Sequence, residues 1–318
     1  MNTLSQFSDF LYATQNRAFE ETRDKIPTVY TKYTKAGDAS EADYRSVTGI
    51  KLGPMGYTPL GGQAHKDEYA PGTTLVIPYK KFTIMVITPS ELIDDMYANG
   101  RIDDQQVKLF ASFPKDFAES ATWTCEVIAS DFQKRGTSAT ATATWQGAGR
   151  DGLSLFSASH VTTKGTPVTW SNLQSAGAMN MFTLMEGVTM LENIPDETGR
   201  PLGSIGGRIG IVHGRYWEWR VPELIKSVKQ PDTLNNNPNA MNLRGVSWEP
   251  ILNPYLGATD TSWMLVNLDD NELLHFMKKK PTFAKDRDPY TGNQINGCEM
   301  RFAIGFDSAK CALLNPGV

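Results

Sequence analysis

The sequence predicts an α+β protein, and three observations indicate this class. Residues 101–135 repeat apolar side chains at helical spacing, and residues 171–192 do so again. The runs "TTLVIPYKKFTIMVIT" and "CEMRFAIGFDSAKCALL" are rich in β-branched and aromatic residues, which favour strands. A chain of 318 residues with this much apolar material is long enough for one large domain or two ordinary ones.

The overall composition limits the partners. The net charge is −4, so no global basic field holds the protein on nucleic acid or on an anionic membrane, and we expect any DNA contact to be local and weak. The cysteines, Cys125, Cys298 and Cys311, form no CxxC pair and leave an odd count, which predicts reduced thiols without a disulfide. The sequence has neither a signal segment nor an apolar run of about 18 residues, so we expect no membrane partner.

The N-terminal part predicts a helix followed by an extended arm. Apolar residues at helical spacing predict an amphipathic helix over residues 3–24, which Pro27 stops. The polar chain that follows, up to about residue 50, is punctuated by Gly37 and Gly49. An arm of this length without a core of its own usually lies on another surface.

Residues 51–88 predict a long excursion from the body of the protein. Glycine and proline are dense in its first part, and a strand-forming run interrupted only by Pro78 follows. We expect a two-stranded hairpin, and an isolated hairpin needs another surface to rest on. Residues 88–100 then predict a short helix that ends at Asn99-Gly100.

Residues 101–135 predict one long amphipathic helix that Gly136 ends. Pro114 lacks an N–H and clashes with the preceding turn, so we expect it to kink or split this helix, with the longer straight part beginning near Pro114. Periodicity alone also fits a core helix of an ordinary domain. The apolar face consists of Val107, Phe110, Phe117, Ala121, Ile128 and Phe132.

The second half of the chain predicts two more helices and several strands. After a linker at residues 137–149, Ser171 and Gln174 stand in capping-box positions for a helix that runs to about Glu192. A third helix is expected near residues 222–229. Strands are expected at "IGIV" (residues 209–212), "LRGVSWEP", "TSWMLVN", "LLHFMKKKPTF" and the C-terminal run, with a turn at "DPYTGN".

The sequence shows no concentrated chemistry. His65, His160, His213 and His275 are far apart, so we interpret each as a satisfied polar residue rather than a metal ligand. The glycines of residues 203–210 lack a following GK[ST] and predict a turn. No GxSxG occurs, and Cys125 is expected to be packed rather than reactive.

The adjacent carboxylates Asp94-Asp95 and Asp103-Asp104 suit helix starts better than acid–base catalysis. We therefore predict no catalytic residue, cofactor or metal site, and no enzyme activity. An enzyme with a site assembled from scattered residues stays as an alternative.

The order of the segments is more specific than any single motif. "ITPSELIDDMYANGRID" precedes the long helix, and "LFSASH", "SNL", "DETGRPL", "RVPELIKSV" and "NPNAMNLRGVSWEPILNPYLGATDTSWMLVN" follow it. This order resembles that of tailed-bacteriophage major capsid proteins with the Hong Kong 97-like fold, most closely the Mu-like head-subunit branch. The likeness covers roughly residues 15–318.

The resemblance implies an arrangement of four parts. They are an N-terminal arm (1–50), an extended loop (51–88), a peripheral domain with a long spine helix (89–155 and 268–303) and an axial domain (156–267 and 304–318). It also implies a structural protein of the virion that self-assembles, in the host cytoplasm, into hexamers and pentamers of an icosahedral head enclosing double-stranded DNA. A portal and a decoration protein are further implied partners. Because the chain starts near the arm, we expect either a separate scaffolding protein or a cleaved precursor, and Met1 favours the separate protein.

Contacts between subunits are expected in the extended loop, on the basic run and at the hairpin tip. Exposed ion pairs contribute only about 0–1 kcal/mol each, so buried apolar area is expected to dominate assembly. Lys-Asn cross-links, known in some relatives, have no alignable partner here. Encapsulin-like compartment shells share the fold and stay as an alternative. The candidate contact residues are Lys66, Asp67, Glu68, Lys80, Lys81, Lys278, Lys279, Lys280, Asp288 and Tyr290.

Overall fold

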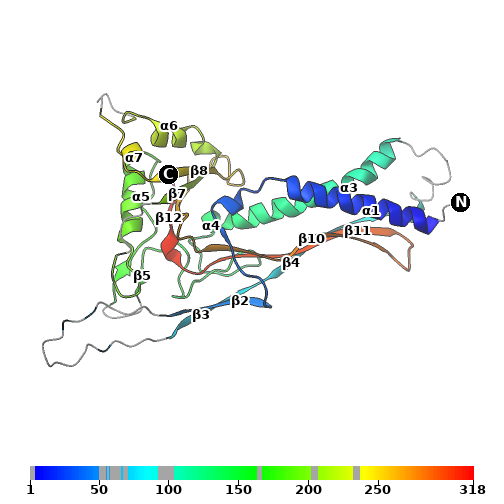
Figure 1. Ribbon diagram of the computed structural model, residues 1–318, viewed down its shortest axis with the longest axis horizontal. Helices are drawn as coiled ribbons and strands as arrows, with labels where there is room; N and C mark the ends of the chain where they lie inside the picture. The colour runs from blue at the N-terminus through cyan, green and yellow to red at the C-terminus, as the bar shows by residue number, and fades with distance from the viewer. Residues whose placement is uncertain are drawn as a thin grey trace. The chain divides into compact units, whose positions relative to one another are not determined.

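The computed structural model describes residues 4–49, 55, 57, 66, 71–91, 104–162, 167–201, 207–231 and 237–318 (Figure 1). The chain forms two compact units. Unit 1 consists of Met1–Thr28, Tyr79–Ile128 and Phe276–Ala303, and unit 2 of Val29–Pro78, Ala129–His275 and Ile304–Val318. The four-part division expected above stays a prediction.

Unit 1 is built on antiparallel strands covered by helices. Strand β4 (Lys80–Thr88) pairs with β11 (Gln294–Phe306) in the register Lys80↔Phe302 to Thr88↔Gln294. The sheet order is β1-β10-β11-β4, where β10 is Leu273–Arg287 and β1 (Lys35–Ala36) pairs with the first residues of β10, which belong to unit 2. Figure 1 shows α1 (Leu4–Lys25) and α3 (Asp104–Ala129) running along these strands.

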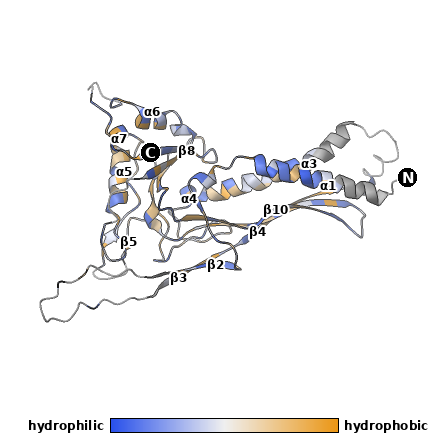
Figure 2. Cartoon of the chain, viewed as in Figure 1, coloured by the Kyte–Doolittle hydropathy of each residue, from blue (hydrophilic) through white to orange (hydrophobic). Residues whose placement is uncertain are grey.

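Phe283 on β10 joins both helices to the sheet. Its ring lies 5.9 Å from that of Tyr12 and 6.1 Å from that of Phe19 in α1, and 6.0 Å from that of Phe117 in α3. Figure 2 shows the described half of α1 as largely hydrophilic, which fits a helix that buries a narrow face containing Phe19. The predicted N-terminal helix is therefore confirmed, and it packs on a strand of its own chain.

The long helix is not split at Pro114, so of the two outcomes expected there the split is wrong. Helix α3 is continuous from Asp104 to Ala129, and a kink at Pro114, with the longer straight part beginning near it, stays a prediction. A proline in a helix interior costs about 3 kcal/mol. Phe117, Ala121, Cys125 and Ile128 are all at most 5% exposed, and burying a large apolar side chain contributes about 1.5–3 kcal/mol, so packing outweighs the proline.

The C-terminal end of the predicted helix divides at Ser130, after which α4 (Asp131–Lys134) forms a separate turn in unit 2. Gly136 lies against it at a distance that excludes a side chain. A Cβ there would lie 2.3 Å from the carbonyl oxygen of Phe132 and 2.5 Å from the ring of Phe156. The helix stop expected at Gly136 is therefore confirmed, with close packing as its reason.

Unit 2 contains a second sheet in the order β12-β9-β7-β8. Strand β7 (Arg208–His213) pairs parallel with β8 (Ser247–Leu252) and antiparallel with β9 (Trp263–Asn267), which pairs with β12 (Ala312–Asn315). Helices α5 (Met181–Asn193), α6 (Arg220–Lys226) and α7 (Ala240–Leu243) pack on it. The buried core includes Leu184, Val188, Leu191, Ile209, Ile211, Val221, Leu224, Trp263, Leu265 and Leu313.

The predicted start of the second helix, near Ser171, is wrong, because the helix begins at Met181. Helix α5 begins after Asn180, whose side chain accepts hydrogen bonds from the N–H groups of Phe182 and Thr183 while Thr183 bonds back to the backbone of Asn180. The hydroxyl of Ser171 instead bonds to the backbone of Leu173. This capping box and a buried, extended Asn172 place residues 171–180 outside the helix.

The two-stranded excursion exists, but its strands differ from the expected ones. Strand β3 (Pro71–Pro78) pairs with β2 (Asp43–Gly49), and β4 belongs to the sheet of unit 1 instead. Pro78 cannot donate a ladder hydrogen bond, and Tyr79 after it is buried, with its ring 5.7 Å from that of Phe276. The chain therefore changes sheet at Pro78-Tyr79.

Smaller elements complete unit 2. They are η1 (Tyr30–Lys32), β5 (His160–Val161), β6 (Thr169–Trp170), η2 (Arg215–Trp217) and η3 (Ala309–Cys311). The linker predicted at residues 137–149 lacks regular structure but buries Trp145 between the rings of Phe132 and Phe306. Most of the helix predicted at 88–100, Asp94-Asp95, Asp103 and the turn at 203–206 lie outside the described residues.

Candidate assembly surfaces

The predicted contact residues that the structure describes lie mainly in unit 1. Lys80 and Lys81 are on β4, Lys278–Lys280 on β10, and Asp288 and Tyr290 in the turn between β10 and β11. Lys66 is exposed, whereas Asp67 and Glu68 lie outside the described residues. Their role in contacts between subunits stays a prediction.

Two of these lysines share a partner within the chain. The carboxylate of Glu299 on β11 accepts hydrogen bonds from Lys279 and from Lys81, the latter at 2.7 Å. The hydrogen bond from Lys279, followed by that from Lys81, lowers the pKa of Glu299 to about 2. The three groups are exposed, so the pairs add little stability. They do reduce the charge that these lysines present to a neighbour.

The tip of the β10–β11 hairpin is a fixed turn that presents one aromatic ring. Asp288 accepts from the N–H of Tyr290 at 3.0 Å and from the hydroxyl of Thr291 at 2.6 Å, and Gly292 has a positive φ of 70°. The bond from Thr291 holds the pKa of Asp288 below its usual value. Asp288 thus stabilises the turn. The side chain of Tyr290 is 96% exposed and faces outward.

Strand β4 carries an apolar surface that the sequence reasoning did not identify. It is the edge strand of the sheet β1-β10-β11-β4. Its side chains Ile84, Met85 and Ile87 are 45%, 65% and 56% exposed. An edge strand with exposed apolar side chains on both faces is a template for association. The available signal was "FTIMVI", which lacks the polar alternation of a strand with one solvated face.

The β2–β3 hairpin shows clear sidedness. Leu75 and Ile77 are buried, whereas Val47 and Val76 are 57% and 46% exposed. Unit 2 also exposes aromatic side chains, namely Phe182, Tyr216 and Trp219. Aromatic residues of this kind dominate protein–protein contacts, so these positions join β4 as candidate surfaces.

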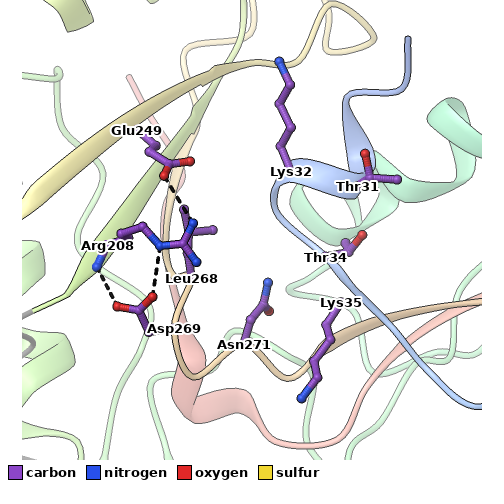
Figure 3. Close-up of a pocket in the computed structure, with 9 residues that line it drawn as sticks. All are labelled: Thr31, Lys32, Thr34, Lys35, Arg208, Glu249, Leu268, Asp269 and Asn271. Atoms are coloured by element: carbon purple, nitrogen blue, oxygen red, sulfur yellow. Dashed lines mark hydrogen bonds and ion pairs between the residues drawn. The ribbon is translucent and has the colours of Figure 1, made fainter. Parts of the chain in front are cut away.

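A cleft of about 420 Å³ in unit 2 is lined by several charged side chains (Figure 3). Arg208 bonds to Asp269 at 3.0 Å and lies 3.5 Å from Glu249, so both acids are engaged. Figure 3 shows Lys32 and Lys35 pointing in opposite directions. The basic groups do not converge on one point, and the cleft does not form an anion site.

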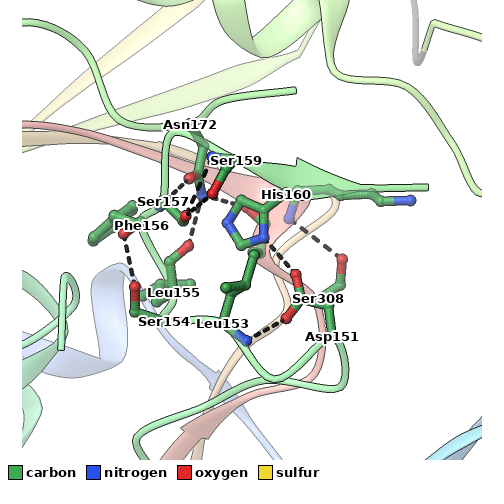
Figure 4. Close-up of polar contacts among 12 residues, drawn as sticks. Asp151, Leu153, Ser154, Leu155, Phe156, Ser157, Ser159, His160, Asn172 and Ser308 are labelled. Carbon is green, nitrogen blue, oxygen red and sulfur yellow. Dashed lines mark hydrogen bonds and ion pairs between the residues drawn. The ribbon is translucent and has the colours of Figure 1, made fainter. Parts of the chain in front are cut away.

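A pair formed by a buried histidine and an exposed aspartate lies elsewhere in unit 2 (Figure 4). The Nδ1 of His160 is 2.5 Å from Asp151, and its ring stacks on Trp170 at 4.4 Å. Burial by itself raises the pKa of Asp151, but the bonds from His160 and the N–H of Leu153 outweigh it, so the pKa is lowered. His160 is fully buried and bonds to a loop carboxylate of its own unit, so we interpret the pair as a structural contact.

His213 and the cysteines are also packed, whereas His65 lies outside the described residues. Burial lowers the pKa of His213, whose Nδ1 is 2.9 Å from the carbonyl oxygen of Gly214. Burial raises the pKa of Cys125 to about 12, which confirms a packed thiol. Among the described residues, no group of three or more His, Cys, Asp or Glu side chains could hold a metal ion. None of the described helices is long and apolar enough to cross a membrane.

His275 makes the stability of unit 2 dependent on pH. Its Nδ1 is 2.9 Å from the hydroxyl of Thr34, whose proton goes to the carbonyl oxygen of Tyr30, so the Nδ1 of His275 donates this bond. Burial lowers its pKa from 6.5 to about 4. As pH falls from 6.5 to 4 the unfolded chain binds a proton that the folded chain does not, so stability is lost in this window.

When the pH is lowered from 7 to 4.5, we expect the free energy of unfolding of the wild-type protein to fall by about 1–3 kcal/mol more than that of His275→Asn. Urea unfolding of the unassembled subunit measures this difference. Asparagine keeps a donor for Thr34 but does not titrate, while His213 titrates in both proteins and cancels. If the free energy of unfolding changed equally with pH in the two proteins, His275 would not be the source of the pH dependence.

Comparisons with known proteins give the class of fold. No protein-family model matches the sequence, and no curated protein matches it. Solved structures do match. The capsid of the native GTA particle superposes with a TM-score of 0.56 and 10% identity over 92% of this chain and 91% of that chain.

Two bacteriophage structures are similar to the same extent. The JBD30 procapsid has a TM-score of 0.53 and 14% identity, covering 99% of this chain and 76% of that chain. The PhiM1 mature capsid has a TM-score of 0.52 and 13% identity, covering 92% of this chain and 88% of that chain. The chain therefore has a phage capsid fold. It is the Hong Kong 97-like fold expected from the order of the segments, while the Mu-like branch stays a prediction.

Proposed function

We propose that this protein is the major capsid protein of a tailed bacteriophage, assembling into hexamers and pentamers of an icosahedral head that encloses double-stranded DNA. The observation that carries the proposal is the similarity to capsid structures over at least 92% of the chain. A scaffolding protein, a portal and a decoration protein belong to the proposal as partners. DNA would be held by confinement and weak contacts, because the net charge of −4 gives no general attraction to it.

The exposed apolar side chains support assembly. Ile84, Met85 and Ile87 on β4 are poorly suited to a permanent monomer, because exposed apolar edge strands associate. In a closed shell each subunit repeats the same contacts, so modest surfaces add up to a stable particle. Burying this apolar area would stabilise a shell more than the exposed ion pairs of the lysine candidates.

Electron microscopy of the purified protein tests the proposal directly. We expect closed shells from the expressed protein and double-stranded DNA in particles from the natural source. Particles that hold a protein cargo and no DNA would instead indicate a compartment shell. A compact monomer at all concentrations would contradict a shell function.

The extended hairpin offers a sharper test. Replacing residues 52–69 by a short Gly-Ser linker keeps β2 and β3, including Leu75, which is buried. We expect a folded subunit that fails to form closed shells, measured by thermal unfolding and by microscopy. The control, Arg200→Ala, removes one charge that is 77% exposed and is not among the contact candidates, so it should assemble normally. Normal shells from the shortened protein would contradict a role of the hairpin in assembly.

A further inference from the structure

Arg150 binds both strands of the β2–β3 hairpin and the end of β11. Its Nη1 donates to the carbonyl oxygen of Ser46 at 3.0 Å and to that of Thr73 at 2.7 Å, so it bridges β2 and β3. Its Nε donates to the carbonyl oxygen of Asp307 at 3.2 Å, and its Nη2 to the Ser46 hydroxyl at 2.7 Å and to the Asp307 carboxylate. One side chain thus joins three segments of unit 2.

The loop that carries Arg150 is fixed on both sides. Before it, the Gln146 side chain accepts from the N–H of Phe306 at 2.9 Å. After it, Asp151 bonds to the buried His160 and to the N–H of Leu153. Because its loop is anchored at both ends, Arg150 is held in place and can restrain the strands to which it bonds.

Apolar packing attaches the hairpin base through one of its faces, where Leu75 and Ile77 are buried. Ile77 packs so tightly on Gly305 that a Cβ there would lie 2.4 Å from the Ile77 Cδ1. The opposite face, with Val47 and Val76, is exposed. Arg150 adds hydrogen bonds to the backbone of both strands, at Ser46 and Thr73, which restrict rotation of the hairpin about its apolar contact.

The contacts require the guanidinium group. The side chains of Arg150 and Asp307 are only 15% and 23% exposed, so their charge-assisted hydrogen bonds are partly shielded from water. The planar fork presents donors on three nitrogens to acceptors in different segments, whereas a lysine ammonium is one point charge on a flexible stem.

We propose that Arg150 is a positioning residue that fixes the direction in which the β2–β3 hairpin leaves unit 2, and thereby the geometry with which it meets a second copy of this chain. The second half of this statement rests on the proposed shell function. The first half concerns the isolated subunit and is independent of it.

The test compares Arg150→Lys and Arg150→Gln with the wild type. In the unassembled subunit we expect amide hydrogen exchange of residues 43–49 and 73–77 to become about tenfold faster, with exchange in β7 and β9 unchanged. In assembly we expect Arg150→Lys to give shells of mixed diameter or open sheets where the wild type gives one size. The matched control is Arg200→Lys, whose side chain is 77% exposed beside Asp196.

Each result decides one of the two statements. Unchanged exchange in β2 and β3 would overturn the positioning role, and shells of wild-type size from Arg150→Lys would overturn its effect on assembly. If the wild type itself forms no shells, the proposed function fails, while the exchange measurement still decides whether Arg150 holds the hairpin.

Discussion

Replacing Trp145 by alanine is expected to lower the free energy of unfolding by about 3–5 kcal/mol. The Trp145 side chain is 2% exposed and lies between the rings of Phe132 and Phe306, at 5.7 and 5.8 Å. Its Nε1 also donates to the carbonyl oxygen of Ser138 at 2.9 Å. Truncation removes the apolar contacts, leaves a cavity and deprives a carbonyl of its donor.

The matched control for Trp145 is Trp219→Ala. Trp219 is 87% exposed, so its removal should change the unfolding free energy by less than about 0.5 kcal/mol. Urea unfolding of the unassembled subunits, followed by circular dichroism, measures both. Equal midpoints for Trp145→Ala and Trp219→Ala would show that Trp145 does not support the core. The comparison also separates folding from assembly, because Trp219→Ala leaves the fold intact while changing an exposed aromatic surface.

Asn172→Ala is expected to cost about 2–4 kcal/mol by leaving several buried backbone groups unsatisfied. Asn172 has no exposed surface. Its Nδ2 donates to the carbonyl oxygens of Leu155 and Ala309 at 2.7 and 2.9 Å, with that of Ala312 at 3.2 Å, and its Oδ1 accepts from the N–H of Ser157 at 3.0 Å. One amide therefore joins three segments of unit 2.

Asn172→Asp distinguishes the hydrogen bonds from the volume of the side chain. Aspartate is nearly the same size and keeps the acceptor for Ser157, but it loses the donors and faces carbonyl oxygens with a charge. We expect it to be at least as destabilising as alanine at pH 7 in urea unfolding. If Asn172→Asp were as stable as the wild type, the amide donors would contribute nothing to stability.

The assembly surfaces were only partly accessible from the sequence. The sequence marks Lys81 and Lys279 as contact candidates, the first in the extended loop and the second in a basic run, yet both bond to Glu299 of the same chain. The exposed apolar side chains of β4 were missed, because the same run also fits a strand buried on both faces. Whether an apolar strand is buried depends on what covers it.

The sequence by itself determined the elements whose signals are local. The N-terminal helix, the strands β7 to β11, the turn at Asp288 and the buried face of α5 from Leu184 to Leu191 follow from periodicity and turn chemistry. Each signal lies within a few residues of its effect, so one sequence is enough to detect it.

Only the tertiary structure decided the exchange of sheets at Tyr79, the late start of α5 and the continuity of α3 through Pro114. The same is true of Arg150, whose partners Ser46 and Asp307 lie 104 and 157 residues away in the chain. In each case packing or hydrogen bonds between distant segments outweigh a local preference of a few kcal/mol. Those distant partners leave no periodic trace in the sequence, and folding alone brings them together.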